Sequence, residues 1–320
     1  MTKRIALLTS GGDSPGMNAA IRAIVRTAIY NEIMVVGVRR GYTGLIQGDY
    51  HEMNLGSVAD IIQRGGTILQ TSRSEEFMTA EGRLKALQQM KAHGIEGLIA
   101  IGGDGTFRGA LELSRLGIPV VGIPGTIDND VPDTDLTIGF DTTVNTVVDC
   151  INKIRDTATS HERVFVIEVM GRHSGEIALA AGLAGGAESI LIPELSVDIS
   201  VVVSNIKRGM ERGKRHSIII AAEGAGSGQA IAAQIESLSG IESRYSVLGY
   251  IQRGGTPTAQ DRLLASRMGA EAVQLLMKGE NGKMTALQNN NLVAVSLEEC
   301  LTKKKSINMG DYYLAGILSI

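Results

Sequence analysis

The chain has 320 residues, 43% of them hydrophobic, and contains 40 glycines and no tryptophan. This is enough apolar material to bury a large core, either as two domains or as one large α/β unit. A formal net charge of −3 argues against the broad basic face that nucleic-acid-binding proteins need. The two cysteines, Cys150 and Cys300, cannot form a disulfide framework or a Cys-based zinc site, so we expect a reducing, cytoplasmic compartment.

The sequence predicts neither secretion nor membrane insertion. The N-terminus leads directly into the strand-like run Arg4 to Thr9, without the apolar stretch and cleavage site of a signal peptide. The longest apolar region, Ile177 to Pro193, is interrupted by Glu188 and by several glycines. A membrane-spanning helix needs about 20 consecutive apolar residues, so we expect none here.

Predicted strands and helices alternate along the chain. Short apolar runs predict strands at residues 4–9, 34–38, 97–101, 120–123, 164–169, 189–193, 217–222 and 244–249. Helical patterns occupy residues 19–30, 80–93, 106–116, 142–159, 198–212 and 258–278. Such alternation predicts an α/β fold with parallel strands and right-handed crossovers. A change of domain is expected near Gly139, where the alternation restarts after an acidic loop.

The first strand leads into a glycine-rich loop, Ser10-Gly11-Gly12-Asp13. Glycines before a helix expose backbone N–H groups and a helix N-terminus, which suits a phosphate; a tight turn that binds nothing is the alternative. The segment Gly12 to Gly16 also matches the Gly-x-Ser-x-Gly pattern of serine hydrolases. That interpretation fails because the residue after the serine must donate its N–H, and Pro15 has none.

A second glycine-rich loop, Gly102-Gly103-Asp104-Gly105-Thr106, again joins a strand to a helix. Its glycines would admit a polyphosphate, and Asp104 could hold magnesium directly or through water. No Gly-x-x-x-x-Gly-Lys-Ser/Thr loop is present, so a P-loop NTPase is not expected. A dinucleotide-binding site is the stronger alternative to a polyphosphate site. However, the glycine spacing differs from Gly-x-Gly-x-x-Gly, and the next strand lacks the acidic residue at its end that would bind the ribose.

A third loop, Gly125-Thr126-Ile127-Asp128-Asn129-Asp130, follows a buried strand. Ligands of parallel sheets bind where strands end, so these carboxylates are placed for chemistry. If the segment is extended, Asp128 and Asp130 project to one side, toward one metal ion or one reacting hydroxyl. A merely polar turn is the alternative.

Several arginines stand at predicted strand boundaries, namely Arg163, Arg172, Arg244 and Arg253. Arginine binds phosphate through two parallel hydrogen bonds, so the set suits capture of a sugar phosphate; a solvated surface would explain any one of them. Arg22 and Arg26, four apart on the first helix, and the basic run 212–216 could form a second anion site or a solvated face.

Five motifs together resemble the bacterial ATP-dependent 6-phosphofructokinases. They are Ser10-Gly11-Gly12-Asp13, Gly102-Gly103-Asp104-Gly105, Pro124-Gly125-Thr126-Ile127-Asp128-Asn129-Asp130, Met170-Gly171-Arg172 and Gly249-Tyr250-Ile251-Gln252-Arg253-Gly254-Gly255. The resemblance implies phosphorylation of fructose 6-phosphate at its 1-hydroxyl by Mg-ATP, giving fructose 1,6-bisphosphate and ADP in glycolysis. It implies two Rossmann-like three-layer domains with mainly parallel sheets and an active site in the cleft between them. The expected domains are 1–138 plus 252–305, binding ATP, and 139–251 plus 306–320, binding the sugar phosphate.

The resemblance also implies roles for individual residues. Asp128 would be the general base, Thr126 and Arg172 would position or stabilise the transferring phosphoryl group, and Asp104 and Asp130 would serve Mg²⁺. The nucleotide would contact Gly12, Tyr42, Arg73, Ser74, Gly102, Gly103, Asp104, Gly105 and Thr106. The sugar phosphate would contact Thr126, Ile127, Asp128, Arg163, Met170, Gly171, Arg172, Glu223, Arg244, Tyr250, Ile251, Gln252 and Arg253. The family assembles as homotetramers in which a neighbouring subunit lends sugar-phosphate arginines.

Effector binding is a further implication of the resemblance, with ADP as activator and phosphoenolpyruvate as inhibitor. The matching positions are Arg22, Ala23, Ile24, Val25, Arg26, Leu55, Gly56, Ser57, Val58, Ala59, Asp60, Arg155, Gly186, Ala187, Glu188, Arg212, Lys214, Arg215 and His216. Some members carry an arginine and an aromatic residue at Leu55 and Gly56. The chain also has Tyr250 where the family usually has histidine, and Ser74-Glu75 replaces the usual apolar or cysteine residue followed by proline.

ATP rather than pyrophosphate is the expected donor. Pyrophosphate-using relatives carry Asp and Lys at the positions of Gly105 and Gly125, and both are glycine here. Two other functions are considered alongside the kinase: a nucleotide- or dinucleotide-binding oxidoreductase, and a sugar-phosphate sensor without catalysis. The set formed by Asp104, Asp128 and Arg172 argues against the sensor.

Overall fold

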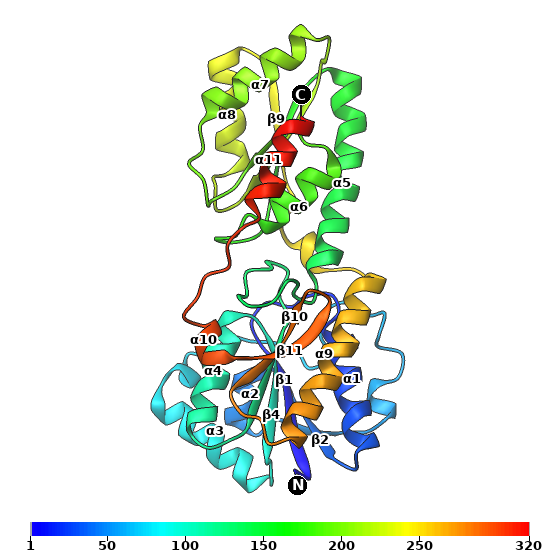
Figure 1. The fold of residues 1–320 in the computed structure, drawn as a ribbon, viewed down its shortest axis with the longest axis vertical. Helices are drawn as coiled ribbons and strands as arrows, with labels where there is room; N and C mark the ends of the chain where they lie inside the picture. The colour runs from blue at the N-terminus through cyan, green and yellow to red at the C-terminus, as the bar shows by residue number, and fades with distance from the viewer. Residues whose placement is uncertain (1, 320) are drawn as a thin grey trace. The chain divides into compact units, whose positions relative to one another are not determined.

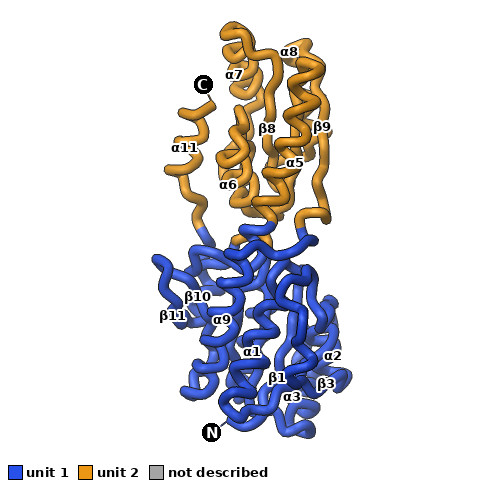
Figure 2. The backbone as a smooth tube through the Cα atoms, turned by 90° about the vertical axis from the view of Figure 1, so that its right-hand side faces the viewer, with its two compact units in different colours: residues 1–126, 130–142, 253–305 blue, residues 127–129, 143–252, 306–320 orange. Residues whose placement is uncertain are grey.

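A computed structural model describes residues 2–319, which form two compact units (Figures 1 and 2). Unit 1 contains the chain up to Thr126, then Asp130–Thr142 and Arg253–Lys305. Unit 2 contains Ile127–Asn129, Thr143–Gln252 and the segment from Ser306 onward. The long middle segment of unit 2 begins at Thr143, inside a helix. The predicted change of domain near Gly139 lies a few residues before this point and stays a prediction.

Unit 1 is built on a seven-stranded sheet in the order β11-β10-β5-β4-β1-β2-β3. The five inner strands run parallel, and the edge strands β3 and β11 are antiparallel to their neighbours. The strands are β1 (Arg4–Thr9), β2 (Met34–Val38), β3 (Tyr50–Met53), β4 (Gly97–Gly102), β5 (Val120–Pro124), β10 (Lys283–Gln288) and β11 (Asn291–Ser296).

Helices cover both faces of this sheet because its inner strands are apolar on both sides. The helical segments are α1 (Met17–Tyr30), α2 (Gly41–Gln47), η1 (Gly56–Val58), η2 (Glu76–Met78), α3 (Ala80–Ala92), α4 (Asp104–Arg115), α9 (Ala259–Met277) and α10 (Leu297–Cys300). Along β1, Ile5 and Leu7 pack with α1 and α9, whereas Ala6 and Leu8 pack with α2, α3 and α4. This alternation along one strand gives the unit two separate apolar cores.

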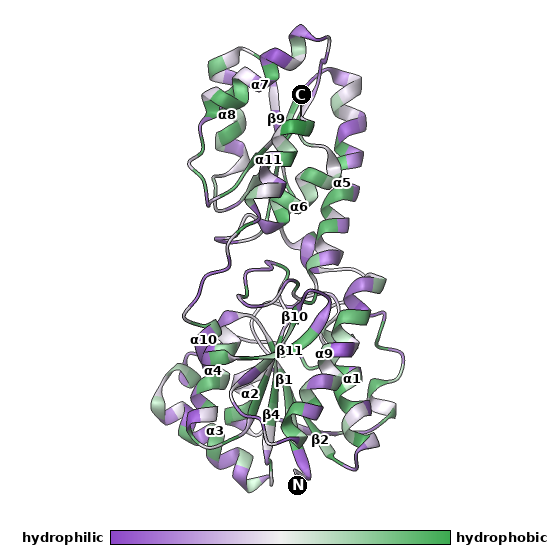
Figure 3. Ribbon diagram, in the orientation of Figure 1, coloured by the Kyte–Doolittle hydropathy of each residue, from purple (hydrophilic) through white to green (hydrophobic). Residues whose placement is uncertain are grey.

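Unit 2 contains a four-stranded parallel sheet in the order β7-β8-β6-β9. The strands are β6 (Val164–Val169), β7 (Ser189–Leu191), β8 (Ser217–Ala222) and β9 (Ser243–Val247). The helices are α5 (Phe140–His161), α6 (Glu176–Gly185), α7 (Ile199–Glu211), α8 (Gly228–Ser239), η3 (Gly249–Arg253) and α11 (Met309–Leu318). Helices α7 and α8 pack on one face of β6 and β8, and the helices in both units carry hydrophilic as well as hydrophobic residues (Figure 3).

The predicted α/β class with mainly parallel sheets is confirmed, and each predicted strand and helix is present with shifts of a few residues at its ends. The prediction missed helices α2, α6, α8, α10 and α11, the short η segments, the hairpin β10–β11 and the edge strand β3. No helix in the described part of the chain is both long and apolar enough to cross a membrane.

Candidate active site

The two glycine loops of unit 1 lie next to each other. Their strands, β1 and β4, are parallel neighbours, so both loops emerge at the same edge of the sheet. The Ser10 N–H donates to the carbonyl of Ile101 at 3.0 Å. A methyl group on Gly102 would lie 2.3 Å from Thr106 Oγ1 and 2.4 Å from the Ser10 carbonyl oxygen. Only glycine allows this approach of the two loops.

The N-terminus of α4 is open to an anionic ligand. Gly103 is its N-cap and provides no side-chain hydrogen bond, so the first-turn N–H groups keep their donor capacity. The Thr106 hydroxyl, buried beside both glycine loops, has no hydrogen-bond partner among residues 2–319. Asp104, half exposed, is 3.1 Å from the guanidinium of Arg108. The loops therefore provide amide donors for a polyphosphate and one accessible carboxylate.

Tyr42 packs beneath the second glycine loop and contacts its Thr106; its predicted contact with the nucleotide stays a prediction. Its ring is 5% exposed and stacks on Phe77, with centroids 4.0 Å apart. Its hydroxyl donates to the Thr106 carbonyl at 2.5 Å, and burial raises the pKa of Tyr42 well above its usual range. Of the other predicted nucleotide residues, Arg73 is exposed and Ser74 accepts a hydrogen bond from the Phe77 N–H at 3.3 Å.

Arg253 lies against the first glycine loop within unit 1. A methyl group on Gly12 would be 2.0 Å from Arg253 Nη1, and the same nitrogen is 3.9 Å from the Asp13 carboxylate. The Arg253 side chain is only 16% exposed. The predicted sugar-phosphate arginine thus also covers a loop predicted to bind nucleotide, a position that sequence spacing could not reveal.

The acidic loop is a turn and not an extended segment, so the condition under which Asp128 and Asp130 would project to one side is not met. Asn129 between them has a left-handed backbone, with φ of 49°, so the alternation of side chains that an extended chain requires is lost. Asp128 is 3% exposed and belongs to unit 2, whereas Asp130 is partly buried and belongs to unit 1.

Asp128 and Arg172 lie together in unit 2. Arg172 Nε is 3.7 Å from Asp128 Oδ2, and the carboxylate is buried while the arginine is 54% exposed. Arg172 follows Gly171 at the end of β6, and both have positive φ values, 53° and 139°. The Arg172 N–H donates to Glu223 Oε1 at 2.7 Å. A non-glycine residue held in this backbone conformation is strained, and such strain is common at functional sites.

The remaining sugar-phosphate arginines stand at the other end of the same sheet. Arg163 precedes β6 and Arg244 begins β9, so both lie at the amino ends of parallel strands. Arg163 Nε is 3.1 Å from the Glu242 carboxylate, which also pairs with Arg244. Arg172 lies beyond the carboxyl end of β6, and a six-residue strand spans about 20 Å. Within unit 2, Arg163 and Arg244 are therefore too far from Arg172 to bind the same phosphate in one chain.

Gln252 has a structural role within unit 2, and its predicted contact with the substrate stays a prediction. It is fully buried: its side chain accepts from the Met170 N–H at 3.2 Å and donates to the Gly249 carbonyl at 3.0 Å. It thereby holds the Met170-Gly171 turn in place. The adjacent Tyr250 and Ile251 are 82% and 56% exposed and are available to a ligand.

The predicted effector residues of unit 2 form a charged cluster. Lys214 pairs with Glu188, whose carboxylate also accepts the Ile218 N–H. Arg155 donates to the carbonyls of Gly185 and Gly186. Burial lowers the pKa of His216 in this cluster, and the charge of Glu188 opposes that shift.

In unit 1, the predicted effector arginines lie on helix α1, where Arg26 is exposed and Arg22 is partly buried. Leu55, Gly56, Ser57, Ala59 and Asp60 are exposed. Four other predicted effector positions have buried side chains, namely Ala23, Ile24, Val25 and Val58. Their predicted role in effector binding would have to come from the backbone or from shape.

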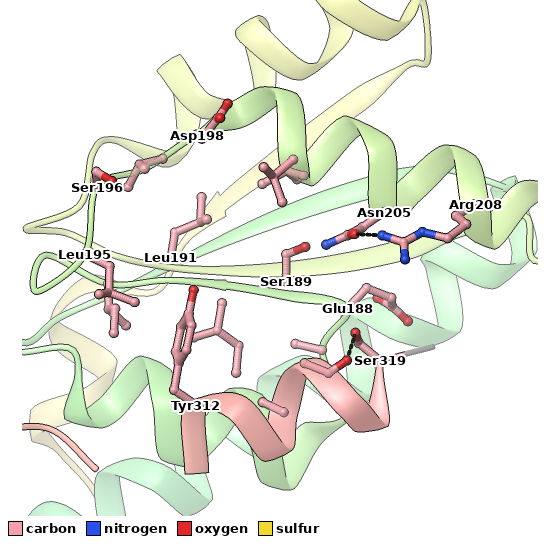
Figure 4. A pocket seen from close by; sticks show the side chains of 18 of the residues that line it. Glu188, Ser189, Leu191, Leu195, Ser196, Asp198, Asn205, Arg208, Tyr312 and Ser319 are labelled. Carbon is pink, nitrogen blue, oxygen red and sulfur yellow. Dashed lines mark hydrogen bonds between the residues drawn. The ribbon is translucent and has the colours of Figure 1, made fainter. Parts of the chain in front are cut away.

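A cavity of about 390 Å³ opens in unit 2 among β7, α7 and α11 (Figure 4). Ala187, Glu188 and Arg212 of the predicted effector set line it, together with apolar residues such as Leu191 and Tyr312. None of the predicted catalytic residues lines this cavity.

Magnesium is compatible with the carboxylates present. The described residues contain no cluster of three or more metal-ligating side chains. Mg²⁺ usually binds to one or two carboxylates and completes its shell with water and substrate phosphates. Asp104, at the first turn of a helix that can accept a phosphate, fits this mode of binding.

Comparison with known proteins identifies the family. The sequence model of the family described as phosphofructokinase matches residues 4–276. The chain belongs to the phosphofructokinase family. Its relatives include ATP-dependent 6-phosphofructokinases from Bacillus licheniformis, 60% identical, and Bacillus subtilis, 59% identical; each match spans 99% of this chain and all of the relative.

Solved phosphofructokinase structures share the fold. The Saccharomyces cerevisiae phosphofructokinase matches with a TM-score of 0.89 and 35% identity over all of this chain, which spans 48% of that longer chain. A pyrophosphate-dependent phosphofructokinase from Nitrosospira multiformis has a TM-score of 0.89 at 22% identity, over 99% of this chain and 92% of its own. At that identity the likeness supports the two-domain Rossmann-like architecture alone.

Proposed function

We propose that this protein transfers the γ-phosphoryl group of Mg-ATP to the 1-hydroxyl of fructose 6-phosphate, giving fructose 1,6-bisphosphate and ADP in glycolysis. The observation that carries the proposal is the buried carboxylate of Asp128 beside the exposed guanidinium of Arg172. A base next to a cation suits a reaction in which an alcohol loses a proton while charge develops on a phosphoryl group. Full-length relatives with this named activity support it.

In the proposed mechanism, unit 1 binds the nucleotide. The N–H groups of the glycine loops and of the first turn of α4 hold phosphate oxygens, and Asp104 and Asp130 would hold Mg²⁺. When bound, Mg²⁺ supplies positive charge that neutralises the phosphate oxygens. Thr126, on the loop between the predicted nucleotide site and the base, positions the transferring group.

Unit 2 would bind the sugar phosphate and carry out the proton transfer. The turn Met170-Gly171, together with Glu223, Tyr250 and Ile251, orients the sugar. Asp128 accepts the proton of the sugar's 1-hydroxyl group while the hydroxyl oxygen attacks the γ-phosphorus of ATP and ADP leaves. Arg172 stabilises the negative charge that develops on the phosphoryl oxygens.

One assay separates the candidate functions: coupled detection of ADP from ATP, Mg²⁺ and fructose 6-phosphate. The proposal requires ADP formation that depends on the sugar and on the metal. An oxidoreductase would instead bind a nicotinamide cofactor and produce no ADP. A sugar-phosphate sensor would bind fructose 6-phosphate without turnover, and either of these results would contradict the proposal.

We also propose a homotetramer in which active sites are shared between subunits. Its support is the separation of Arg163 and Arg244 from Arg172 along the sheet of unit 2. Arginines that cannot reach the sugar phosphate of their own chain can serve the site of a neighbour. The family resemblance implies the same arrangement.

Replacement of Arg244 by alanine is expected to raise the KM for fructose 6-phosphate at least ~10-fold, with a smaller change in kcat. The loss of a charge-assisted hydrogen bond to phosphate explains this, since such bonds contribute about 1.5–3 kcal/mol. Steady-state kinetics measures the effect, and Lys207→Ala, an exposed cation on α7, is the control. Mixed oligomers of Arg244→Ala and Asp128→Ser subunits should regain sites with wild-type KM; no recovery would contradict shared sites.

Replacement of Gly105 by aspartate is expected to raise the KM for ATP at least ~10-fold, because the new carboxylate would face the ATP phosphates without a compensating positive charge. A Cβ at Gly105 would meet no atom within 4 Å, so we expect the backbone there to accept a side chain. The KM for ATP is the measurement, and Gly105→Ala is the control for size alone. Robust activity of the wild-type protein with pyrophosphate and none with ATP would overturn ATP as donor.

Regulation and location complete the proposal. The effector residues on α1 and the Lys214–Glu188 cluster support binding of ADP as activator and phosphoenolpyruvate as inhibitor. A cytoplasmic location agrees with the two free cysteines, Cys150 and Cys300, the latter buried with its pKa raised to about 11 by burial. Activity measured against each effector at subsaturating fructose 6-phosphate tests the regulatory part.

A further inference from the structure

Asp261 is a buried carboxylate that the mechanism above does not use. It stands in the first turn of α9 and is 1% exposed. Its Oδ1 accepts the Gly139 N–H at 2.8 Å, and its Oδ2 accepts the Thr142 N–H at 2.8 Å and the Thr142 hydroxyl at 2.5 Å. Burial raises the pKa of Asp261, and these hydrogen bonds oppose the shift. Every partner is a donor, which an ionised carboxylate satisfies and an amide cannot.

The same contacts join the first turns of α5 and α9 within unit 1. The Thr258 N–H donates to Thr142 Oγ1 at 3.0 Å, and the Thr258 hydroxyl donates to Asp141 Oδ2 at 2.6 Å. Thr258 also caps α9 by accepting the Asp261 N–H at 3.2 Å. Two helix N-termini, distant in sequence, are thus tied through Asp261, Thr142 and Thr258.

The segment that Asp261 holds is hydrogen-bonded to the loop that carries Thr126 and Asp128. Ile138, next to Gly139, donates its N–H to the Pro124 carbonyl at 2.9 Å and forms a β-bridge with Gly125. The Thr137 hydroxyl donates to the Thr126 carbonyl at 2.6 Å. Residues 137–139, the return limb of the acidic loop, therefore connect the Asp261 carboxylate to Thr126.

The return limb also packs against the first glycine loop. A methyl group on Gly139, where φ is 106°, would lie 2.5 Å from the Ser14 Cβ. A methyl group on Gly16 would lie 2.6 Å from the Ile138 side chain and 3.6 Å from the Asp261 Cβ. These contacts leave no room for a side chain at Gly16 or Gly139, so the return limb is closely packed where it passes Ser14 and Gly16.

We propose that Asp261 is a positioning residue for phosphoryl transfer: its carboxylate fixes the return limb 137–139, and through it the placement of Thr126. This inference rests on the proposed function for its kinetic consequence. Reaction rates depend steeply on alignment, and a displacement of about 1 Å can reduce a rate by about 100-fold. The carboxylate is buried with all three of its hydrogen bonds to Gly139 and Thr142, so in this proposal it acts through Thr126 and its effect should appear in turnover more than in binding.

The principal test is Asp261→Asn, which keeps the shape of the side chain but turns an amide N–H toward a donor. We expect kcat to fall at least ~10-fold while the KM for ATP changes by less than about threefold. Met268→Ala, a fully buried position further along α9, is the control for stability and should keep kcat within about twofold of wild type. All variants are compared at a temperature at which thermal melts show each to be folded.

Two further measurements keep the inference testable if Asp261→Asn folds poorly or the chain has another activity. Thr137→Val removes the hydroxyl that holds Thr126 and should lower kcat; in the double variant the two effects should not add, because both act through one limb. Hydrogen exchange of the peptide covering residues 124–139, measured without substrate, should accelerate in Asp261→Asn and not in Met268→Ala. Unchanged exchange with unchanged kcat, or equal kcat losses in Asp261→Asn and Met268→Ala, would overturn the proposal.

Discussion

Substitution of Asp128 by serine is expected to lower kcat for phosphorylation of fructose 6-phosphate by at least ~100-fold, the usual scale for loss of a general base. The KM for the sugar should change far less, because the carboxylate acts mainly in the transition state. Asp128 is buried beside Arg172, at 3.7 Å, so serine would remove both the base and the partner of that guanidinium. Steady-state kinetics at saturating Mg-ATP measures both constants.

The matched control is Asp133→Asn. Asp133 lies in the same acidic loop but pairs with Lys303 at 2.8 Å and has no proposed role in catalysis. We expect this variant to retain kcat within about twofold. If turnover survived in Asp128→Ser, another group would be the base and the assignment would be wrong.

Substitution of Arg172 by alanine is the second large effect that we expect, a decrease in kcat of about 10²–10³-fold. This is the range observed when one donor to a developing oxyanion is removed. Arg172→Lys should recover only part of the rate, since lysine keeps the charge but not the planar fork of N–H groups. Single-turnover kinetics would place the loss in the chemical step.

Two controls accompany this prediction because Arg172 has a φ of 53°. Arg172→Gly removes the same guanidinium without backbone strain and should lose activity as alanine does. Arg208→Ala, at an exposed arginine of unit 2 outside the proposed catalytic set, should have little effect. Near-normal kcat in either Arg172 variant would contradict its proposed role.

The alternation of strands and helices was readable from the sequence because each inner strand is a continuous apolar run. Helix α6 was missed since its sequence is apolar on all sides and lacks the periodicity of a surface helix. The hairpin β10–β11 did carry a local signal. Asn289 and Asn290 form its turn with φ values of 49° and 64°, and such dipeptides favour the tight turns of hairpins.

The sequence predicted which residues belong to the candidate site better than it predicted how they are arranged in space. The motifs placed Asp128 and Arg172 in one functional set, but the spacing left open whether the acidic loop is extended or a turn, and the left-handed Asn129 makes it a turn. The supporting residues could not be inferred. Asp261 lies 119 residues from Thr142 along the chain, and Gln252 lies 82 from Met170. These side chains accept hydrogen bonds from buried backbone N–H groups, which need partners. The local sequence around such an N–H group does not show which distant side chain will be its partner.

The most direct test of the account is a crystal structure of the protein with fructose 6-phosphate and a non-hydrolysable Mg-ATP analogue. We predict that the free 1-hydroxyl oxygen lies within hydrogen-bonding reach of an Asp128 oxygen, about 2.6–3.2 Å, with the γ-phosphorus in line behind it and Arg172 on a phosphoryl oxygen. A 1-hydroxyl beyond reach of Asp128, or pointing away from the γ-phosphate, would contradict the account.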